Sequence, residues 1–176
     1  VKALATANAR ATTPGWLAEE ACKIEIEKLR EPIGKQDQYA SAHGGICSYL
    51  FHEDDTVTVS PLALSEQTMK SLNEQLLLFY TGETRSASTL LADQVIRTQT
   101  ADDEMLANLD QTKKLGERAM QLLLNNNLVQ FAEDMHIHWE IKRSRSPGMT
   151  SRRIDDMYNL ARQNGAIGGK IVGAGG

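Results

Sequence analysis

Glu25 is a carboxylate on the apolar face of a predicted helix. Thr13 and Pro14 mark the helix start as N-cap and first helical residue, and the helical pattern continues to about Leu29. At about 100° per residue, Glu25 lies within the arc of apolar side chains, where a carboxylate costs several kcal/mol unless a cation, a metal or hydrogen-bond donors meet it. Two interpretations stay open at this point: a buried salt bridge or edge position, and a metal or substrate ligand.

A polar cluster bounded by glycines follows this helix. It reads Gly34-Lys35-Gln36-Asp37-Gln38-Tyr39, and Gly44-Gly45 comes shortly after it. Small residues on both sides of polar ones allow backbone and ligand to approach closely. Asp37 is therefore a candidate for catalysis, although an aspartate near a helix start is often only a cap.

Thr81 to Ser86 lies where a predicted buried strand meets the start of a helix. Free backbone N–H groups and the helix dipole favour anions at such a place. Arg85 could add a bidentate contact to a phosphate group. A plain turn with an exposed arginine is the alternative.

The chain ends in a glycine-rich run, Gly168-Gly169-Lys170-Ile171-Val172-Gly173-Ala174-Gly175-Gly176. This run is similar to a loop that cradles phosphate, but it lacks the G-x-x-x-x-G-K-[ST] spacing of a Walker A motif. The basic run from Lys142 to Arg145 could also meet a phosphate, although a solvated loop is the favoured interpretation.

Two histidines on one predicted helix offer no metal site. His136 and His138 are two positions apart, so their side chains point roughly 200° away from each other and cannot chelate one ion. No cage of histidine and cysteine is evident elsewhere in the sequence.

The elements that position these residues alternate irregularly along the chain. Helices are predicted over about 1–9, 14–29, 36–42, 86–97, 102–124, 128–142 and 151–164. Residues 46–51 and 56–60 predict a hairpin, and the apolar runs 75–81 and 168–172 predict strands, the first buried on both faces. This order favours an α+β fold rather than a repeating βαβ fold.

Composition narrows the class of protein. Hydrophobic residues make up 41% of the chain and charged residues 24%, which is ordinary for a globular domain. A net charge of −4 without a basic block argues against a nucleic-acid partner, and no apolar run is long enough to cross a membrane. Two cysteines form no disulfide framework, so a reduced cytoplasmic protein is expected.

Several of these segments together resemble the GHMP kinases. The run from Glu25 to Gly45 resembles the segment that carries their catalytic aspartate, often as G-x-x-D-Q, and the run from Phe79 to Ser88 resembles a later one. The final GGKIVGAGG resembles their third glycine-rich motif. Within this superfamily the sequences of these motifs most resemble those of the D-glycero-D-manno-heptose 7-phosphate kinases.

The resemblance implies transfer of the ATP γ-phosphoryl group to a hydroxyl of a sugar phosphate, with Mg²⁺. Asp37 matches the aspartate that orients or deprotonates the acceptor hydroxyl, and Glu25 falls where an acidic Mg²⁺ ligand is expected. Contacts to the substrate are assigned to Gln38, Tyr39, Gly45 and Arg85. Contacts to the nucleotide are assigned to Gly173, Ala174, Gly175 and Gly176.

The resemblance also implies a domain arrangement. Residues 1–72 would be the later part of the N-terminal domain, and residues 73–176 most of a helix-rich C-terminal domain with an antiparallel sheet. The main phosphate loop of the family is not in the sequence, so we expect a piece of a longer kinase with little activity of its own.

Two alternatives to this function stay open. The acceptor could be another small molecule of the galactose, fucose or mevalonate type, or the chain could be a non-catalytic binding domain with a kinase fold. The oligomeric state is also open, with a homodimer as one option.

Overall fold

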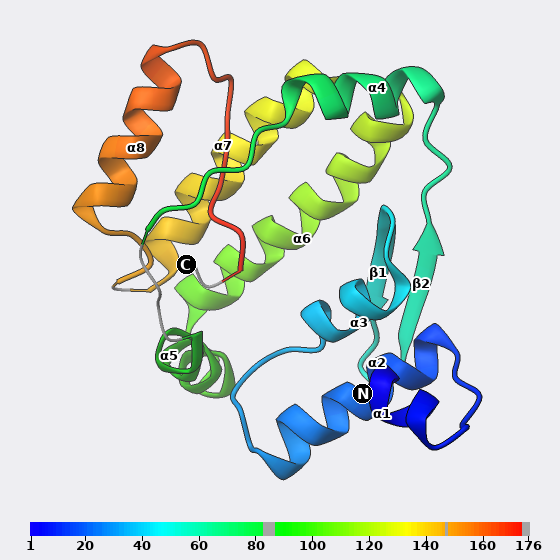
Figure 1. The fold of residues 1–176 in the computed structure, drawn as a ribbon. Helices are drawn as coiled ribbons and strands as arrows, with labels where there is room; N and C mark the ends of the chain where they lie inside the picture. Colours follow the sequence, from blue (N-terminus) through cyan, green and yellow to red (C-terminus); the bar gives the residue numbers. More distant parts are fainter. Residues whose placement is uncertain (83–86, 147, 174–176) are drawn as a thin grey trace. The chain divides into compact units, whose positions relative to one another are not determined.

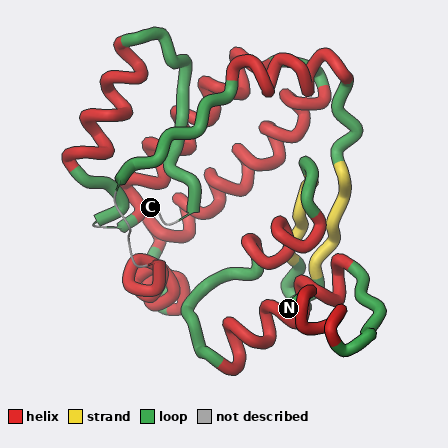
Figure 2. Tube along the Cα trace, viewed as in Figure 1, coloured by secondary structure: helices red, strands yellow, loops and turns green. Residues whose placement is uncertain are grey.

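The chain forms two compact units. The computed structural model describes residues 1–82, 87–146 and 148–173. Unit 1 is Val1–Leu62 and unit 2 is Ala63–Gly176. Helices are the main regular element of both units, and the two strands found in the described residues pair in unit 1 (Figure 2). The predicted α+β class is confirmed.

Unit 1 begins with α1 (Lys2–Ala7) and α2 (Pro14–Cys22). The predicted start of α2 is confirmed, because the hydroxyl oxygen of Thr13 accepts a hydrogen bond from the backbone N–H of Trp16 at 3.2 Å. The guanidinium of Arg10 lies 4.2 Å from the centre of the Trp16 ring and covers this first turn.

The α-helix predicted to run to Leu29 is wrong beyond Cys22. Residues Lys23–Lys28 form a π-helix, η1, in which the N–H of Leu29 donates to the carbonyl of Ile24 at 2.9 Å. A π turn is wider than an α turn, so the 100° spacing no longer places the side chains. Ile24 and Leu29, which a regular helix would place in the apolar arc, are 38% and 64% exposed.

The rest of unit 1 is α3 (Gln36–His43) and a hairpin of β1 (Cys47–Phe51) and β2 (Val57–Pro61). The strands are antiparallel, with Cys47 opposite Pro61 and Phe51 opposite Val57, which confirms the predicted hairpin. Helices α2 and α3 pack against each other. Their core is Ala18, Cys22 and Tyr39, flanked by Ile26, Ala42, Tyr49, Val57 and Val59.

Unit 2 consists of helices joined by coil (Figure 1). The helices are α4 (Glu66–Gln75), α5 (Ala87–Gln99), α6 (Asp103–Leu124), α7 (Leu128–Arg145) and α8 (Arg152–Gln163). The long helices α6 and α7 pack side by side. The buried apolar residues of unit 2 lie on these two helices, on α8 and in the connection before α8. They are Met105, Leu123, Trp139, Met149 and Ile154. No helix of the described residues is both long and apolar enough to cross a membrane.

Side-chain caps start most of the helices in unit 2. Ser65 caps α4, Asp102 caps α6, Asn127 caps α7 and Ser151 caps α8, each through an oxygen that accepts a backbone N–H. Helix α4 was not predicted. The serine before an unbroken stretch without proline or glycine is the signal that could have found it.

The strand predicted over residues 75–81 is not formed. Helix α4 continues to Gln75, and the residues after it are coil. The side chains of Leu76 to Tyr80 are between 56% and 88% exposed, so the segment is not buried on either face. A strand needs a partner strand for its backbone hydrogen bonds, and within 1–82, 87–146 and 148–173 the only ladder joins β1 and β2.

The strand predicted over residues 168–172 is also absent. The segment is coil, and its backbone bonds to a side chain of α7 instead of to a neighbouring strand. The ammonium of Lys142 donates to the carbonyl oxygens of Ile171, at 3.1 Å, and of Gly173. These contacts satisfy carbonyls that a sheet would otherwise pair.

The predicted domain boundary between residues 72 and 73 falls inside α4. The compact units divide earlier, after Leu62, so α4 belongs to unit 2. The assignment of these parts to the two domains of a kinase stays a prediction.

Gly168 allows the C-terminal segment to lie directly on α7. A Cβ atom at this position would come within 1.8 Å of the carbonyl oxygen of Ala132 and 3.1 Å of the backbone N of His136. Both are backbone atoms of α7, so neither can move aside as a flexible side chain would. The segment or the helix would have to shift.

We predict that Gly168→Ala lowers the free energy of unfolding by about 1–3 kcal/mol, the usual cost of overpacking. Gly116→Ala is the matched control. Gly116 lies within α6 with open space around it, so alanine there should stabilise by about 1 kcal/mol through helix propensity. Urea denaturation followed by circular dichroism measures both. Equal stability of the two variants would show that the segment does not press on α7.

Candidate functional site

Glu25 turns toward α3 from the π-helix. Its carboxylate is half-buried and accepts a hydrogen bond from the side-chain amide of Gln38. No lysine or arginine of the described residues pairs with it, so the salt bridge considered from the sequence is not formed. One neutral donor satisfies only part of the capacity of a carboxylate, which has about four acceptor sites.

Gln38 is the second member of this pair. Its side chain is 8% exposed, and its amide oxygen is buried without a hydrogen-bond partner. An unpaired buried oxygen beside a carboxylate is an arrangement that a cation would satisfy, since Mg²⁺ takes oxygen ligands only. Mg²⁺ commonly uses one or two carboxylates and completes its shell with phosphate oxygens and water. The donors present therefore fit a Mg²⁺ ion that arrives with a phosphate group.

A metal held by the protein alone does not fit. No group of three or more histidine, cysteine, aspartate or glutamate side chains in the described residues could hold a metal ion. Any metal here would depend on ligands from a bound substrate.

Asp37 lies in the first turn of α3 and is exposed. It is not the N-cap, which is Lys35 and makes no side-chain cap bond. The ammonium of Lys35 instead donates to the carbonyl and the carboxylate of Asp55, at 2.9 and 3.1 Å, in the hairpin turn. Among the residues that the structure describes, the Asp37 carboxylate has no hydrogen bond or ion pair, so it is open to a ligand.

The other residues assigned to the substrate in unit 1 differ in burial. Tyr39 is 6% exposed and belongs to the core, where its ring stacks on His43 and meets the edge of Phe51. Gly45 is exposed, with a φ of +63° that favours glycine, and it follows Gly44, which ends α3. Their roles toward a substrate stay predictions.

Part of the predicted site in unit 2 lies outside the described residues, namely Arg85 and Ala174 to Gly176. Gly173 is described, has a φ of +61°, and offers its carbonyl oxygen to Lys142.

The basic run at the end of α7 was predicted as a solvated loop, and this is wrong. Lys142, Arg143 and Arg145 belong to the last turn of the helix. Arg145 donates to the side chains of Asn108, at 2.8 Å, and of Thr112, at 2.7 Å, on α6. Its partners are neutral, so its positive charge is not compensated by a carboxylate among the residues described here. This role of Arg145 has no signal in the sequence, because nothing local marks a partner more than thirty residues away.

The two histidines of α7 have separate partners, as their spacing predicts. His136 Nδ1 lies 2.6 Å from the hydroxyl of Tyr158, and the two rings stack with centroids 5.9 Å apart. His138 Nδ1 lies 3.3 Å from the ammonium of Lys170.

Electrostatics around His138 favour its neutral form. Burial lowers the pKa of His138 to about 4, and the positive charges of Lys170, Lys142 and Arg145 act in the same direction. Burial also lowers the pKa of Lys170, with a smaller contribution from Arg145. The C-terminal segment thus lies against a positively charged part of α7.

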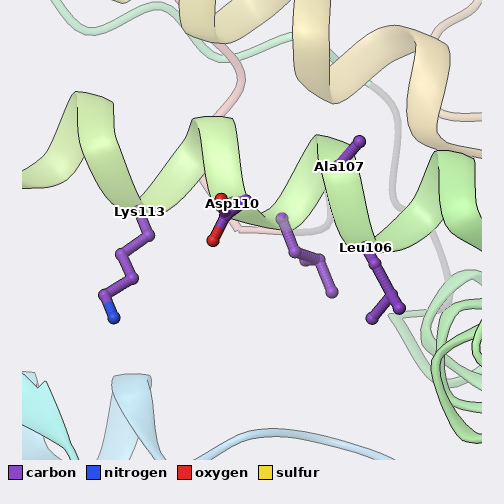
Figure 3. A pocket seen from close by; sticks show the side chains of 5 residues that line it. Leu106, Ala107, Asp110 and Lys113 are labelled. Atoms are coloured by element: carbon purple, nitrogen blue, oxygen red, sulfur yellow. The ribbon is translucent and has the colours of Figure 1, made fainter.

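A hollow of about 450 Å³ lies along α6 (Figure 3), and none of the candidate site residues described above lines it. All of its lining residues come from this one helix: Leu106, Ala107, Leu109, Asp110 and Lys113. A hollow with a single wall cannot enclose a ligand as a binding pocket does.

The family described as GHMP kinases C terminal matches residues 119–176. The helix-rich fold with its two-stranded antiparallel sheet is GHMP-kinase-like, and residues 119–176 are similar to the C-terminal domain of that family. The resemblance inferred from the sequence motifs is confirmed at this level.

Individual relatives narrow the likeness. A D-glycero-alpha-D-manno-heptose 7-phosphate kinase of Campylobacter jejuni is 28% identical over 159 residues, which cover 90% of this chain and 46% of that protein. A bifunctional fucokinase/GDP-fucose pyrophosphorylase of Arabidopsis thaliana is 26% identical over 145 residues, which cover 81% of this chain and 14% of that protein.

A solved structure has a similar fold. The crystal structure of a D-glycero-D-manno-heptose 1-phosphate kinase from Bacteroides thetaiotaomicron superposes with a TM-score of 0.70 and 26% identity. The superposition covers 99% of this chain and 46% of that one. The chain thus spans about half the length of the heptose phosphate kinases that it matches.

We predict that acid destabilises unit 2 through His138. Its pKa in the fold, about 4, lies below its ordinary value of 6.5, so the unfolded chain binds more protons between these two pH values. The stability is fully present above pH 6.5 and falls by up to about 1.4 kcal/mol per pH unit below it. His138→Gln should flatten this dependence. Urea denaturation at pH 7 and pH 5 measures it.

The control for this experiment is His52→Gln. His52 belongs to unit 1, so its replacement should leave the pH dependence of unit 2 unchanged. An unaltered slope in the His138 variant would contradict the assignment.

Proposed function

We propose that the protein carrying this chain is an ATP-dependent sugar kinase of the GHMP type that acts on a heptose 7-phosphate and forms the 1,7-bisphosphate. The observation that carries the proposal is the half-buried Glu25 carboxylate beside the orphaned oxygen of Gln38, in the unit that also presents Asp37. The heptose phosphate kinases among the relatives support the acceptor class.

Asp37 is the proposed catalytic residue. In the transfer, the acceptor oxygen forms a bond to the γ-phosphorus of ATP, the bond from that phosphorus to the β–γ bridging oxygen breaks, and ADP leaves. The acceptor proton passes to the carboxylate of Asp37, which also orients the hydroxyl. The exposure of Asp37 and its lack of a partner among the described side chains suit a group that must meet a substrate.

Glu25 is the proposed Mg²⁺ ligand, with the amide oxygen of Gln38 next to it. When bound, Mg²⁺ would neutralise charge on the transferring phosphate groups. Glu25 contributes one negative charge, and the hydrogen bond from Gln38 fixes the direction of its carboxylate. This division, with one carboxylate on the metal and one on the nucleophile, is sufficient because phosphoryl transfer needs mainly positioning and charge neutralisation.

The remaining assignments complete the proposal. Gln38, Tyr39 and Gly45 would contact the sugar, and Arg85 would contact its phosphate group. The nucleotide phosphates would lie against the glycine-rich run at Gly173, Ala174, Gly175 and Gly176. A cytoplasmic location and binding partners limited to ATP and the sugar phosphate follow from this function, and a homodimer remains an option.

A neutral sugar is the second candidate acceptor, because a fucokinase is also among the relatives. Galactose and mevalonate are acceptors of the same general type. A non-catalytic domain with a kinase fold is the third candidate, and the retention of both carboxylates, Glu25 and Asp37, argues against it.

We predict that the full-length protein releases ADP with a heptose 7-phosphate and that Asp37→Asn lowers kcat about 10²-fold or more. A coupled ADP assay with heptose 7-phosphate, galactose, fucose and mevalonate measures this. Asp110→Asn is the control, since Asp110 forms only an exposed pair with Lys114 on α6. Turnover with a neutral sugar alone would select the second candidate.

Two results of that assay would contradict the proposal. No turnover with any acceptor would exclude the kinase, and near-normal kcat in the Asp37 variant would mean that this residue only shapes the site.

We predict that Glu25→Gln raises the Mg²⁺ concentration needed for half-maximal activity about tenfold or more, while Glu27→Gln does not. Both residues belong to η1, but Glu27 is exposed and Glu25 faces Gln38. Initial rates over a range of Mg²⁺ at saturating ATP give the value. The same Mg²⁺ requirement in both variants would remove Glu25 from the metal site.

A further inference from the structure

The C-terminal segment Gly168–Gly173 follows α7 at three levels. Gly168 lies against the backbone of Ala132 and His136, and Lys170 lies beside His138. Ile171 and Gly173 then meet Lys142 near the end of the helix. Later residues of the segment meet later residues of the helix, so the two run in the same direction (Figure 1).

Lys142 makes the last of these contacts. Its ammonium has three donors and no acceptor, and it gives hydrogen bonds to the carbonyl oxygens of Ile171 and Gly173. The bond to the Ile171 carbonyl fixes the orientation of the peptide group between Ile171 and Val172. This matters because the segment has no sheet partner among the residues described that could fix it otherwise.

The orientation of the peptide group between Ile171 and Val172 determines where its N–H points. In a trans peptide the C=O and N–H point in opposite directions. Because the Ile171 carbonyl points at the ammonium, the N–H of Val172 points away from it. Val172 is 69% exposed, so this side of the segment is accessible. Backbone N–H groups directed outward in this way favour anions.

Positively charged side chains near the segment also favour an anion. Lys142, Lys170 and Arg145 each act electrostatically on His138, and Arg145 also acts on Lys170. The described partners of Arg145 are the neutral side chains of Asn108 and Thr112. The segment thus combines the outward N–H of Val172 with a positive potential from α7, and both attract phosphate.

We propose that Lys142 is a positioning residue for the nucleotide: by holding the carbonyl of Ile171 it directs the backbone N–H of Val172 toward the phosphate groups of ATP. This inference rests on the proposed kinase function and adds to it a residue on α7. In this role Lys142 acts through the backbone carbonyls that its ammonium holds and need not touch the nucleotide.

The test compares Lys142→Met with Lys142→Arg in the full-length protein. Methionine keeps the length and apolar character of the side chain without the donors, whereas arginine keeps the charge and donors. We expect Lys142→Met to raise the KM for ATP about tenfold and to change the KM for the sugar less than about twofold. Lys142→Arg should restore most of the affinity. Lys114→Met, which removes an exposed lysine of α6, is the control.

Hydrogen exchange of the backbone amides in 168–173 gives a second readout that needs no turnover. Loss of the clamp should accelerate exchange there in Lys142→Met and leave exchange in α6 unchanged. If Lys142→Met does not fold, Lys142→Gln, which keeps an amide donor, takes its place in both measurements.

The outcomes separate the two proposals. An unchanged KM for ATP overturns the positioning role, whether or not exchange is accelerated, because acceleration alone would be a purely structural effect. Wild-type protein without turnover overturns the proposed function. In that case accelerated exchange would still support Lys142 as the residue that holds the segment, and unchanged exchange would overturn this as well.

Discussion

The hydrogen bond from Gln38 to Glu25 is the interaction on which the arrangement of the candidate site in unit 1 depends. A half-buried carboxylate needs a partner, and here the partner comes from the first turn of the next helix. The π turn of Lys23–Lys28 changes the direction of Glu25 relative to a regular helix. With Gln38 fixed, its neighbours are fixed too: Asp37 is exposed on one side and Tyr39 enters the core on the other.

The helices could be predicted from the sequence because their signals are local. Thr13, Asp102 and Ser151 each accept a backbone N–H from the first turn, and such a bond depends only on residues three positions apart. The hairpin of β1 and β2 is local in the same sense. The runs 75–81 and 168–172 are different, because an apolar run becomes a strand only beside a second strand. Their composition does not say whether that partner is present.

The candidate site was predictable only in part, and for different reasons at different residues. Glu25 drew attention as a carboxylate among apolar side chains, and it is half-buried, although the regular helix assumed for that argument ends at Cys22. A π turn has no simple sequence signal, so the altered direction of Ile24 and Leu29 could not be foreseen. The role of Lys142 in holding the C-terminal segment could not be foreseen for a different reason. Its partners are 29 and 31 residues away and are backbone carbonyls, which carry no mark in the sequence.

The exposed run Leu76–Tyr80 has a consequence for how the chain behaves in concentrated solution. It is a stretch of consecutive apolar residues that contains neither charge nor proline, and its side chains are mostly in contact with solvent. Such segments pair with copies of themselves through their backbones, so self-association should rise steeply with concentration. Glu74 before the run and Glu83 after it in the sequence are charges of the kind that oppose this stacking. The colloidal stability of the chain therefore depends on a balance between five apolar residues and two flanking carboxylates.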